Sequence, residues 1–185
     1  MQTLEARSYS LADAVGKLSN ARVLSIQTEW ENAGWKLWVR ETAERMKISF
    51  QIEPLQSPVN EAEYRRAFDA MQRDHVEGVL TGISLESYTH RHLLGRLAQE
   101  YHLPAIAGYT ETVESGALMS YAWDHKAADR RLAAQIVEIL NGGNPAEMPY
   151  FQETHWELVI NLKAAKELGL EIPAGLVASA DRVIE

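Results

Sequence analysis

Apolar and polar residues along the chain follow two periods, one typical of strands and one typical of helices. Short apolar segments predict strands at residues 21–26, 78–81 and 103–107, and apolar residues that alternate with polar ones predict another at residues 48–52. Between these strands, apolar residues recur three or four positions apart, as Tyr64, Phe68 and Met71 do, which predicts helices with one apolar face. Strands that alternate with helices require a parallel sheet with right-handed crossovers and helices on both faces. The predicted fold is therefore α/β, a three-layer α/β/α sandwich around a mainly parallel sheet.

Several helix starts are marked by capping residues. Asn60, with Glu63 three residues later, resembles a capping box. The other positions suited to cap a helix are Asn32, Ser84 and Asp124. Of the helices that follow, one is expected over residues 85–101, and the one after Asp124 has an apolar face made of Ala128, Leu132, Ile136 and Ile139.

Beyond residue 107 the order of elements changes. We expect a polar loop, a short extended segment, a strand and a short helix, in that order, at residues 109–116, 118–121, 157–161 and 162–168. Pro173 precedes a final predicted helix whose apolar residues are Leu176, Val183 and Ile184.

The composition narrows the class of protein. The 185 residues are 46% hydrophobic and 24% charged, which suits one globular domain with a sizeable core. The net charge of −8 argues against nucleic acid or an anionic membrane as the main partner, because both attract a basic surface. Cysteine is absent, so the sequence excludes disulfides, thiolate chemistry and cysteine-ligated metals.

No motif indicates an enzyme. The sequence contains no Gly-x-Gly-x-x-Gly, no Walker loop and no Gly-x-Ser-x-Gly elbow. Thr81 stands where a receiver-type phosphoacceptor domain would place its aspartate. The six histidines are scattered along the chain. We therefore expect no catalytic residue, no cofactor and no metal site.

Stretches of the second half resemble the ABC-type substrate-binding proteins with a type I periplasmic-binding fold. They lie at residues 103–121, 139–149, 157–173 and 180–185, and they occur in the order that the family shows. Residues 21–102 fit the same lobe by their order of elements. The resemblance is to the C-terminal lobe of such proteins. It assigns residues 1–20 to a linker with an N-terminal helix and residues 21–185 to the lobe.

The resemblance implies a function and a location. Members bind a small solute, such as an amino acid, without chemistry, and they work with an ABC permease in the periplasm. Residues 1–7 show no basic start and no apolar run typical of a secretory signal. If Met1 is the native start, we expect the chain in the cytoplasm. The alternative function is then a cytoplasmic small-molecule sensor, or a dimeric interaction module, derived from such a lobe.

Residues 118–150 correspond to a segment that crosses to the first lobe in that family and packs on it. Residues 1–20 resemble only the helix that links the lobes, so the crossing segment needs another cover. One prediction is a homodimer, with this segment exchanged between the two chains. The other is that the segment folds back onto its own domain. The sequence leaves both open.

The candidate site lies where the carboxyl ends of the parallel strands meet. Hydroxyl groups at this edge can bind a carboxylate, and flat rings can hold an apolar or aromatic group. The predicted ligand-binding residues are Thr28, Trp30, Thr81, Ser84, Tyr109, Ser120 and Tyr121. Glu29 and Glu111 are candidates to pair with a ligand amine. Simpler roles stay open for several of these residues, with Trp30 in the core, Ser84 as a cap and Tyr121 in an intermolecular contact.

Overall fold

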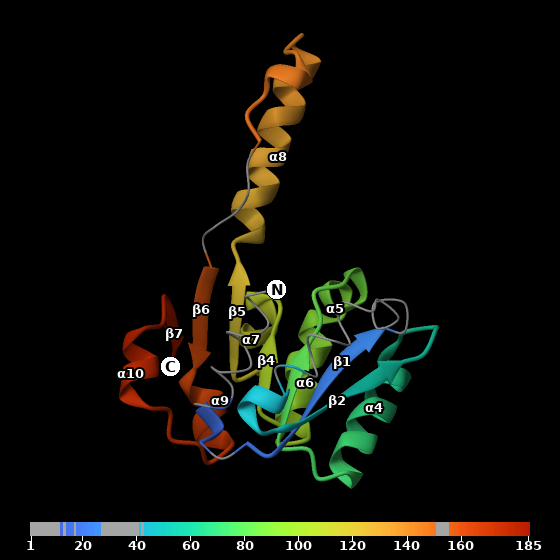
Figure 1. The fold of residues 1–185 in the computed structure, drawn as a ribbon, viewed down its shortest axis with the longest axis vertical. Coiled ribbons are helices and arrows are strands. Elements are labelled where there is room, and N and C mark those ends of the chain that lie inside the picture. The colour runs from blue at the N-terminus through green and yellow to red at the C-terminus, as the bar shows by residue number, and fades with distance from the viewer. Residues whose placement is uncertain (1–11, 13, 17, 27–40, 42, 151–155) are drawn as a thin grey trace.

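One seven-stranded sheet runs through the part of the chain that the structure describes. The structure is a computed structural model, and it describes residues 12, 14–16, 18–26, 41, 43–150 and 156–185. The strands are β1 (Asn20–Ile26), β2 (Ser49–Leu55), β3 (Gly78–Thr81), β4 (Ala105–Ala107), β5 (Met119–Trp123), β6 (Trp156–Asn161) and β7 (Arg182–Ile184). Their order across the sheet is β2-β1-β3-β4-β5-β6-β7 (Figure 1). Neighbouring strands are parallel except β5 and β6, which are antiparallel.

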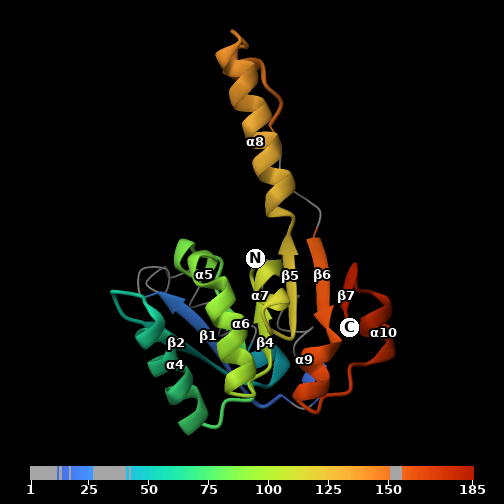
Figure 2. The same cartoon turned by 180° about the vertical axis from the view of Figure 1, so that it is seen from behind.

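Helices pack on both faces of this sheet. The described helices are α4 (Glu61–Arg73), α5 (Leu85–Thr89), α6 (Arg91–Glu100), α7 (Thr110–Glu114), α8 (His125–Leu140), the 3-10 helix η1 (Pro145–Glu147), α9 (Leu162–Glu167) and α10 (Ala174–Ala178). Of these, α8 and η1 project away from the sheet (Figure 1). Helices α4, α6 and α7 supply the core of one face (Figure 2). Ala14 and Leu18, with apolar residues from 162–180, supply the core of the other. The predicted three-layer fold with a mainly parallel sheet is confirmed.

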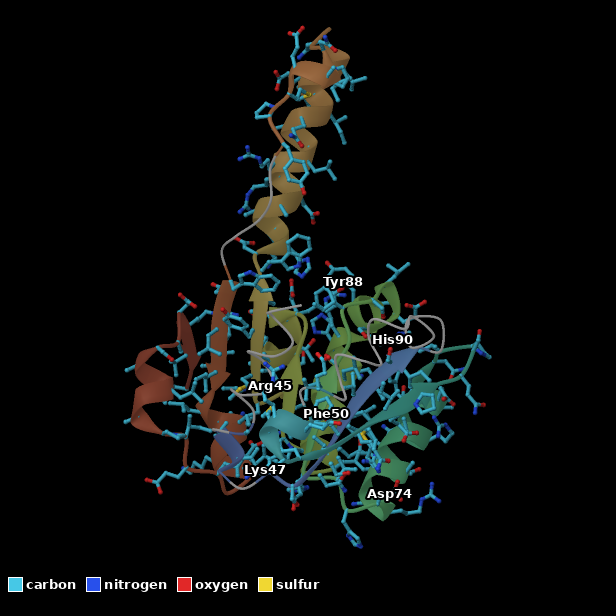
Figure 3. All side chains as sticks on the ribbon, in the orientation of Figure 1. Arg45, Lys47, Phe50, Asp74, Tyr88 and His90 are labelled. Carbon is cyan, nitrogen blue, oxygen red and sulfur yellow. The ribbon has the colours of Figure 1, made fainter. Side chains whose placement is uncertain are left out.

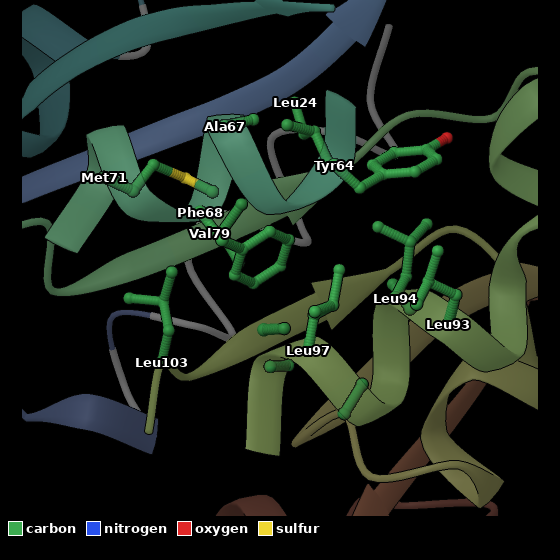
Figure 4. Packing of buried hydrophobic residues seen from close by; sticks show 14 of the residues in the cluster. Leu24, Tyr64, Ala67, Phe68, Met71, Val79, Leu93, Leu94, Leu97 and Leu103 are labelled. Carbon is green, nitrogen blue, oxygen red and sulfur yellow. The ribbon is translucent and has the colours of Figure 1, made fainter. Parts of the chain in front are cut away.

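The larger core lies between the sheet and helices α4 and α6. Tyr64, Phe68 and Met71 project from α4 toward Val79 of β3 and Leu97 of α6 (Figure 4). These side chains are fully buried. Burial of this apolar surface is the main force that holds the two helices on the sheet.

The predicted capping residues in the described part take the expected roles. The side chains of Ser84 and Asp124 accept hydrogen bonds from the first turns of α5 and α8. The Asn60 side chain accepts a hydrogen bond from the Glu63 backbone N–H at 3.1 Å. The capping box is only half formed, because the Glu63 carboxylate binds the Gln56 N–H at 2.8 Å.

The prediction of one continuous helix over residues 85–101 is wrong. The chain forms α5 and α6, which meet at His90. The break lets α6 run along the sheet with Leu94 and Leu97 in the core, while Leu85 and Tyr88 of α5 stay exposed. The apolar periodicity predicts one helix here, but packing of α6 against the core divides the segment into two helices.

The loop predicted over residues 109–116 contains the short helix α7. Thr112 and Val113 are buried, and the Asn161 Nδ2 group donates a hydrogen bond to the Val113 carbonyl at 3.0 Å. Tertiary contacts stabilise a helix of five residues that local sequence alone does not indicate.

The final predicted helix is too long. Helix α10 ends at Ala178, and Val183 and Ile184 belong to β7, which is parallel to β6. The Asp181 carboxylate accepts a hydrogen bond from the Leu158 N–H at 2.8 Å. This contact brings the end of the chain to the edge of the sheet, where its apolar residues pack in a strand.

Helix α8 projects away from the rest of the molecule (Figures 1 and 2). None of its residues is buried. Within the crossing segment, β5 is a strand of the sheet, whereas α8 is not folded back onto its own domain in this structure. Its apolar residues, including Leu132, Ile136 and Ile139, are exposed.

Candidate ligand-binding site

The carboxyl ends of β1, β3, β4 and β5 meet at one edge of the sheet, because these four strands are parallel. In the described part, this edge is formed by residues 81–84 after β3, 108–109 after β4 and 123–125 at the end of β5. Helices α5 and α8 begin there (Figure 1). Ligands of open parallel sheets bind at this edge.

The loops after β3 and β4 are packed tightly against each other. The Thr81 hydroxyl accepts a hydrogen bond from the Gly108 N–H at 3.3 Å. A Cβ atom at Gly108 would lie 2.8 Å from the Gly82 carbonyl oxygen, so only glycine fits there. The contact holds the start of the Tyr109 segment beside the Ser84 segment.

Ser84 and Tyr109 are predicted site residues that the structure brings together. The Tyr109 hydroxyl donates a hydrogen bond to the Ser84 carbonyl at 3.2 Å. The Ser84 hydroxyl accepts from the Ser87 N–H at 3.1 Å, which is the capping role. Both side chains are buried, so Tyr109 presents part of its ring to neighbouring rings rather than to solvent.

Four rings lie one after another along this edge and form a row, which consists of Tyr88, Tyr109, His125 and Trp123. The guanidinium of Arg91 stacks at the Tyr88 end. The guanidinium of Arg91 lies 4.3 Å from the centroid of the Tyr88 ring. The Tyr88 and Tyr109 rings are 5.1 Å apart, and the Tyr109 and His125 rings are 4.9 Å apart. Trp123 follows, 4.8 Å from His125. This row offers a surface for a flat apolar group.

Two members of the row have distinctive surroundings. Burial lowers the pKa of His125, although Glu111, Asp129, Asp124 and a hydrogen bond with the Gly108 backbone act in the opposite direction. The imidazole is therefore neutral at pH 7, and its buried Nε2 atom has no hydrogen-bond partner among the described residues. Tyr88 lies at one end of the row, and its side chain is 40% exposed to solvent. Figure 3 shows it near His90.

Apolar side chains continue the surface beyond the rings. Ile83 is partly exposed, and Leu85 is exposed to 76%. Exposed leucine and isoleucine beside an aromatic row form an apolar patch that favours contact with a ligand or another protein surface.

Ser120 and Tyr121 do not join this surface. Ser120 lies inside β5 and is fully buried, and its hydroxyl has no hydrogen-bond partner in the part of the chain that the structure describes. Tyr121 packs on the second core and stacks on Trp156, with ring centroids 5.9 Å apart. Thr28, Trp30 and Glu29 lie outside the described residues.

Beside the row lies a charged cavity of about 240 Å³. Its acidic and basic residues are largely paired with one another. Lys126 lies 3.6 Å from Glu111, and Arg182 lies 3.0 Å from Glu114. Glu111, a predicted partner for a ligand amine, thus already has a cation beside it.

Sequence reasoning missed Tyr88, Arg91 and His125. Two signals in the sequence pointed to Tyr88 and His125. Leu85 and Tyr88 are three residues apart just after the Ser84 cap, so they share one face of a helix that begins at the edge. His125 follows the Asp124 cap directly, which places it at the same edge.

Within the described residues, no group of histidines and carboxylates is arranged to hold a metal ion. In the same part of the chain, no helix combines the length and apolar character needed to cross a membrane.

Comparison with known proteins identifies relatives by family and by fold. A family model described as "ABC transporter substrate binding protein" matches residues 39–184. A search of curated protein sequences finds no match. Three solved structures show the same fold. A conserved domain protein from Vibrio cholerae has a TM-score of 0.81 and 19% identity, over 97% of this chain and 60% of that one.

The second structure is an ABC domain in complex with L-Trp from Streptococcus pneumonia. Its TM-score is 0.80 at 22% identity, over 98% of this chain and 62% of that one. The third is a ligand-free, open substrate-binding protein with adhesive properties from Clostridium difficile. Its TM-score is 0.65 at 17% identity, over 99% of this chain and 60% of that one. The chain thus spans about three fifths of the length of each.

Proposed function

Because this chain belongs to the ABC transporter substrate-binding protein family, we propose that it binds a small amino-acid-like solute at the carboxyl edge of its sheet. The family is a class of binding proteins without catalytic activity. The observation that carries the proposal is the row formed by Tyr88, Tyr109, His125 and Trp123, which lies where parallel sheets bind ligands. The hydrogen bonds of Thr81 with Gly108 and of Ser84 with Tyr109 hold the segment that carries the Tyr109 ring.

The proposed ligand carries a flat apolar group. Aromatic rings favour flat partners through stacked and edge-to-face contacts. The solved relative from Streptococcus pneumonia holds L-Trp, so L-tryptophan is a reasonable first probe. In a transport role the chain works in the periplasm with an ABC permease. A sensing role uses the same site without a permease.

Replacing Tyr88 with alanine is expected to weaken the binding of L-tryptophan about tenfold. A ring contact of this kind contributes about 1 kcal/mol or somewhat more beyond its buried area. Thermal unfolding with and without ligand measures the change, because a ligand at 100 times its Kd stabilises the folded state by about 2.7 kcal/mol.

The matched control for this experiment is Tyr150→Ala, since Tyr150 is 90% exposed and far along the chain from the row. The proposal predicts a wild-type shift with L-tryptophan that the control keeps and Tyr88→Ala reduces. An equal shift in all three proteins would place the ligand elsewhere. No wild-type shift would contradict binding of this solute.

We also propose that a second copy of the chain covers helix α8. All of the large apolar side chains that are exposed in the described part lie in two regions, residues 83–88 and 132–150. The stripe on α8 contains Leu132, Ile136 and Ile139, spaced so that they share one face. Two-fold pairing buries the same stripe on both chains.

Ile136→Asp is therefore expected to convert a dimer into a monomer of 20.8 kDa. A carboxylate at the centre of an apolar interface loses hydration without gaining a partner. Light scattering coupled to size-exclusion chromatography measures the mass. Ala134→Asp is the control, because it adds the same charge on the opposite face of α8. A monomeric wild-type protein, or a dimer that survives Ile136→Asp, would contradict this interface.

A further inference from the structure

We propose that Arg91 binds the carboxylate of the solute, so that the ligand is an organic acid or amino acid whose flat group lies beside Tyr88. This inference rests on the proposed function, since it concerns the same edge of the sheet. It names the chemical group that the protein recognises and the residue that recognises it.

The predicted hydroxyl residues in the described part of this edge, Thr81, Ser84 and Ser120, are buried and do not face a ligand. The Thr81 hydroxyl accepts a hydrogen bond from the Gly108 N–H. The Ser84 hydroxyl binds the Ser87 N–H and lies 3.3 Å from the Ser87 hydroxyl. Ser120 is fully buried. A ligand carboxylate therefore needs another donor.

Arg91 is a cation at this edge with no carboxylate partner among the residues that the structure describes. Its Nη1 atom donates to the Tyr88 carbonyl at 2.7 Å. Its Nε atom is buried and has no hydrogen-bond partner within the described part of the chain. A guanidinium has five N–H donors in a planar fork that matches a carboxylate. Most of this fork has no acceptor in the described structure.

Other cations near the edge differ from Arg91 in this respect. Lys126 lies beside Glu111, and Arg130 lies 4.0 Å from Asp124. Arg91 has no ion pair of this kind among the described residues, and it is only partly exposed. A half-buried guanidinium loses hydration, so an incoming carboxylate gains more from it than from an exposed cation.

The start of α6 reinforces the preference for an anion. Arg91 is its first residue, no side chain caps this end, and its first turn contains no acidic residue. The N-terminus of a ten-residue helix carries a partial positive charge that favours an anion. An anion held by Arg91 therefore also meets a favourable field.

The orientation of Arg91 connects it to the ring surface. The guanidinium stacks over Tyr88, whose ring leads through Tyr109 to His125. The stack restrains the fork beside the exposed end of the row. A small acid with a ring can then place its carboxylate at Arg91 and its ring along the exposed part of the row.

Three related probes separate the carboxylate from the ring. They are L-phenylalanine, 3-phenylpropionate, which lacks the amine, and phenethylamine, which lacks the carboxylate. Isothermal titration calorimetry is performed with the wild type, Arg91→Gln, Arg91→Lys and Arg96→Gln. Arg96 is an exposed arginine on the same helix and serves as the control. Thermal unfolding without ligand checks that each variant is folded.

Arg91→Gln is expected to weaken the binding of L-phenylalanine and of 3-phenylpropionate roughly tenfold to a hundredfold. This is the effect of losing a hydrogen bond to a charged group. Arg91→Lys keeps the positive charge but loses the planar fork of donors, so its affinity for both acids falls between those of the wild type and Arg91→Gln. Arg96→Gln matches the wild type. Phenethylamine binds more weakly than 3-phenylpropionate to the wild type, and Arg91→Gln does not weaken it further.

Two results would overturn this inference while leaving the proposed function intact. One is wild-type affinity of Arg91→Gln for both acids. The other is tighter wild-type binding of phenethylamine than of 3-phenylpropionate. If the wild type binds none of the three probes, the role of Arg91 and the aromatic solute site both fail.

Discussion

Replacing Phe68 with alanine is expected to lower the free energy of unfolding by about 3–5 kcal/mol. Phe68 projects from α4 into the larger core and is 1% exposed. Its ring packs 5.4 Å from the ring of Tyr101 at the end of α6. The substitution removes the apolar contacts of the ring and leaves a cavity that the surrounding helices cannot fully close.

Chemical denaturation followed by circular dichroism measures this loss. Gln72→Ala is the control, because Gln72 is exposed on the same helix as Phe68 and its truncation leaves no cavity. We expect a change within about 0.5 kcal/mol for the control. A similar small change for Phe68→Ala would show that the core is packed differently from the structure. Since domains are stable by only about 5–15 kcal/mol, the predicted loss is a large part of the total.

Replacing Gly95 with alanine is expected to destabilise the protein by about 3 kcal/mol, at the upper end of the cost of overpacking. A Cβ atom at Gly95 would lie 2.4 Å from the Thr112 carbonyl oxygen and 2.7 Å from the Ser115 Cβ atom. These atoms belong to α7 and the residue that ends it. The helix therefore has to move away from α6, and backbone atoms cannot move at low cost.

The same substitution is expected to weaken ligand binding, which Phe68→Ala is not. Helix α7 begins directly after Tyr109, so a shift of α7 displaces the centre of the aromatic row. Asn161 holds α7 from the other side through the Val113 carbonyl. L-tryptophan titrations of the two variants, at a temperature where both are folded, test this difference.

Gly175→Ala is the control for the glycine substitution. Gly175 is also helical, and a Cβ atom there meets nothing within 4 Å. Alanine favours a helix by up to about 1 kcal/mol over glycine, so the control is expected to be neutral or slightly stabilising. If Gly95→Ala behaves like this control, the close contact between α6 and α7 is wrong.

Local patterns in the sequence were sufficient to predict the three-layer architecture. The spacing of Tyr64, Phe68 and Met71 indicated the buried face of α4, because a helix brings residues three and four apart onto one side. The apolar runs at 21–26 and 78–81 indicated buried strands for a similar reason. Asn60, Ser84 and Asp124 marked helix starts, since capping depends on a side chain and the backbone of the next turn.

Elements stabilised by distant contacts were not predictable in this way. Helix α7 has too few residues to form alone, and its formation depends on Gly95 and Asn161. Strand β7 depends on pairing with β6. The division of residues 85–101 at His90 depends on how α6 fits the sheet. In each case, partners far along the sequence decide the local structure.

For the site, the sequence by itself determined the edge of the sheet and some of the residues there, including Thr81, Ser84 and Tyr109. It did so because the carboxyl ends of parallel strands meet at one edge, whatever the details of packing. Only the tertiary structure decided which side chains face the surface. Ser120 is enclosed in β5, whereas Tyr88 and Arg91 share the edge with Tyr109. Side-chain exposure depends on contacts between segments distant in sequence, and these exist only once the chain has folded.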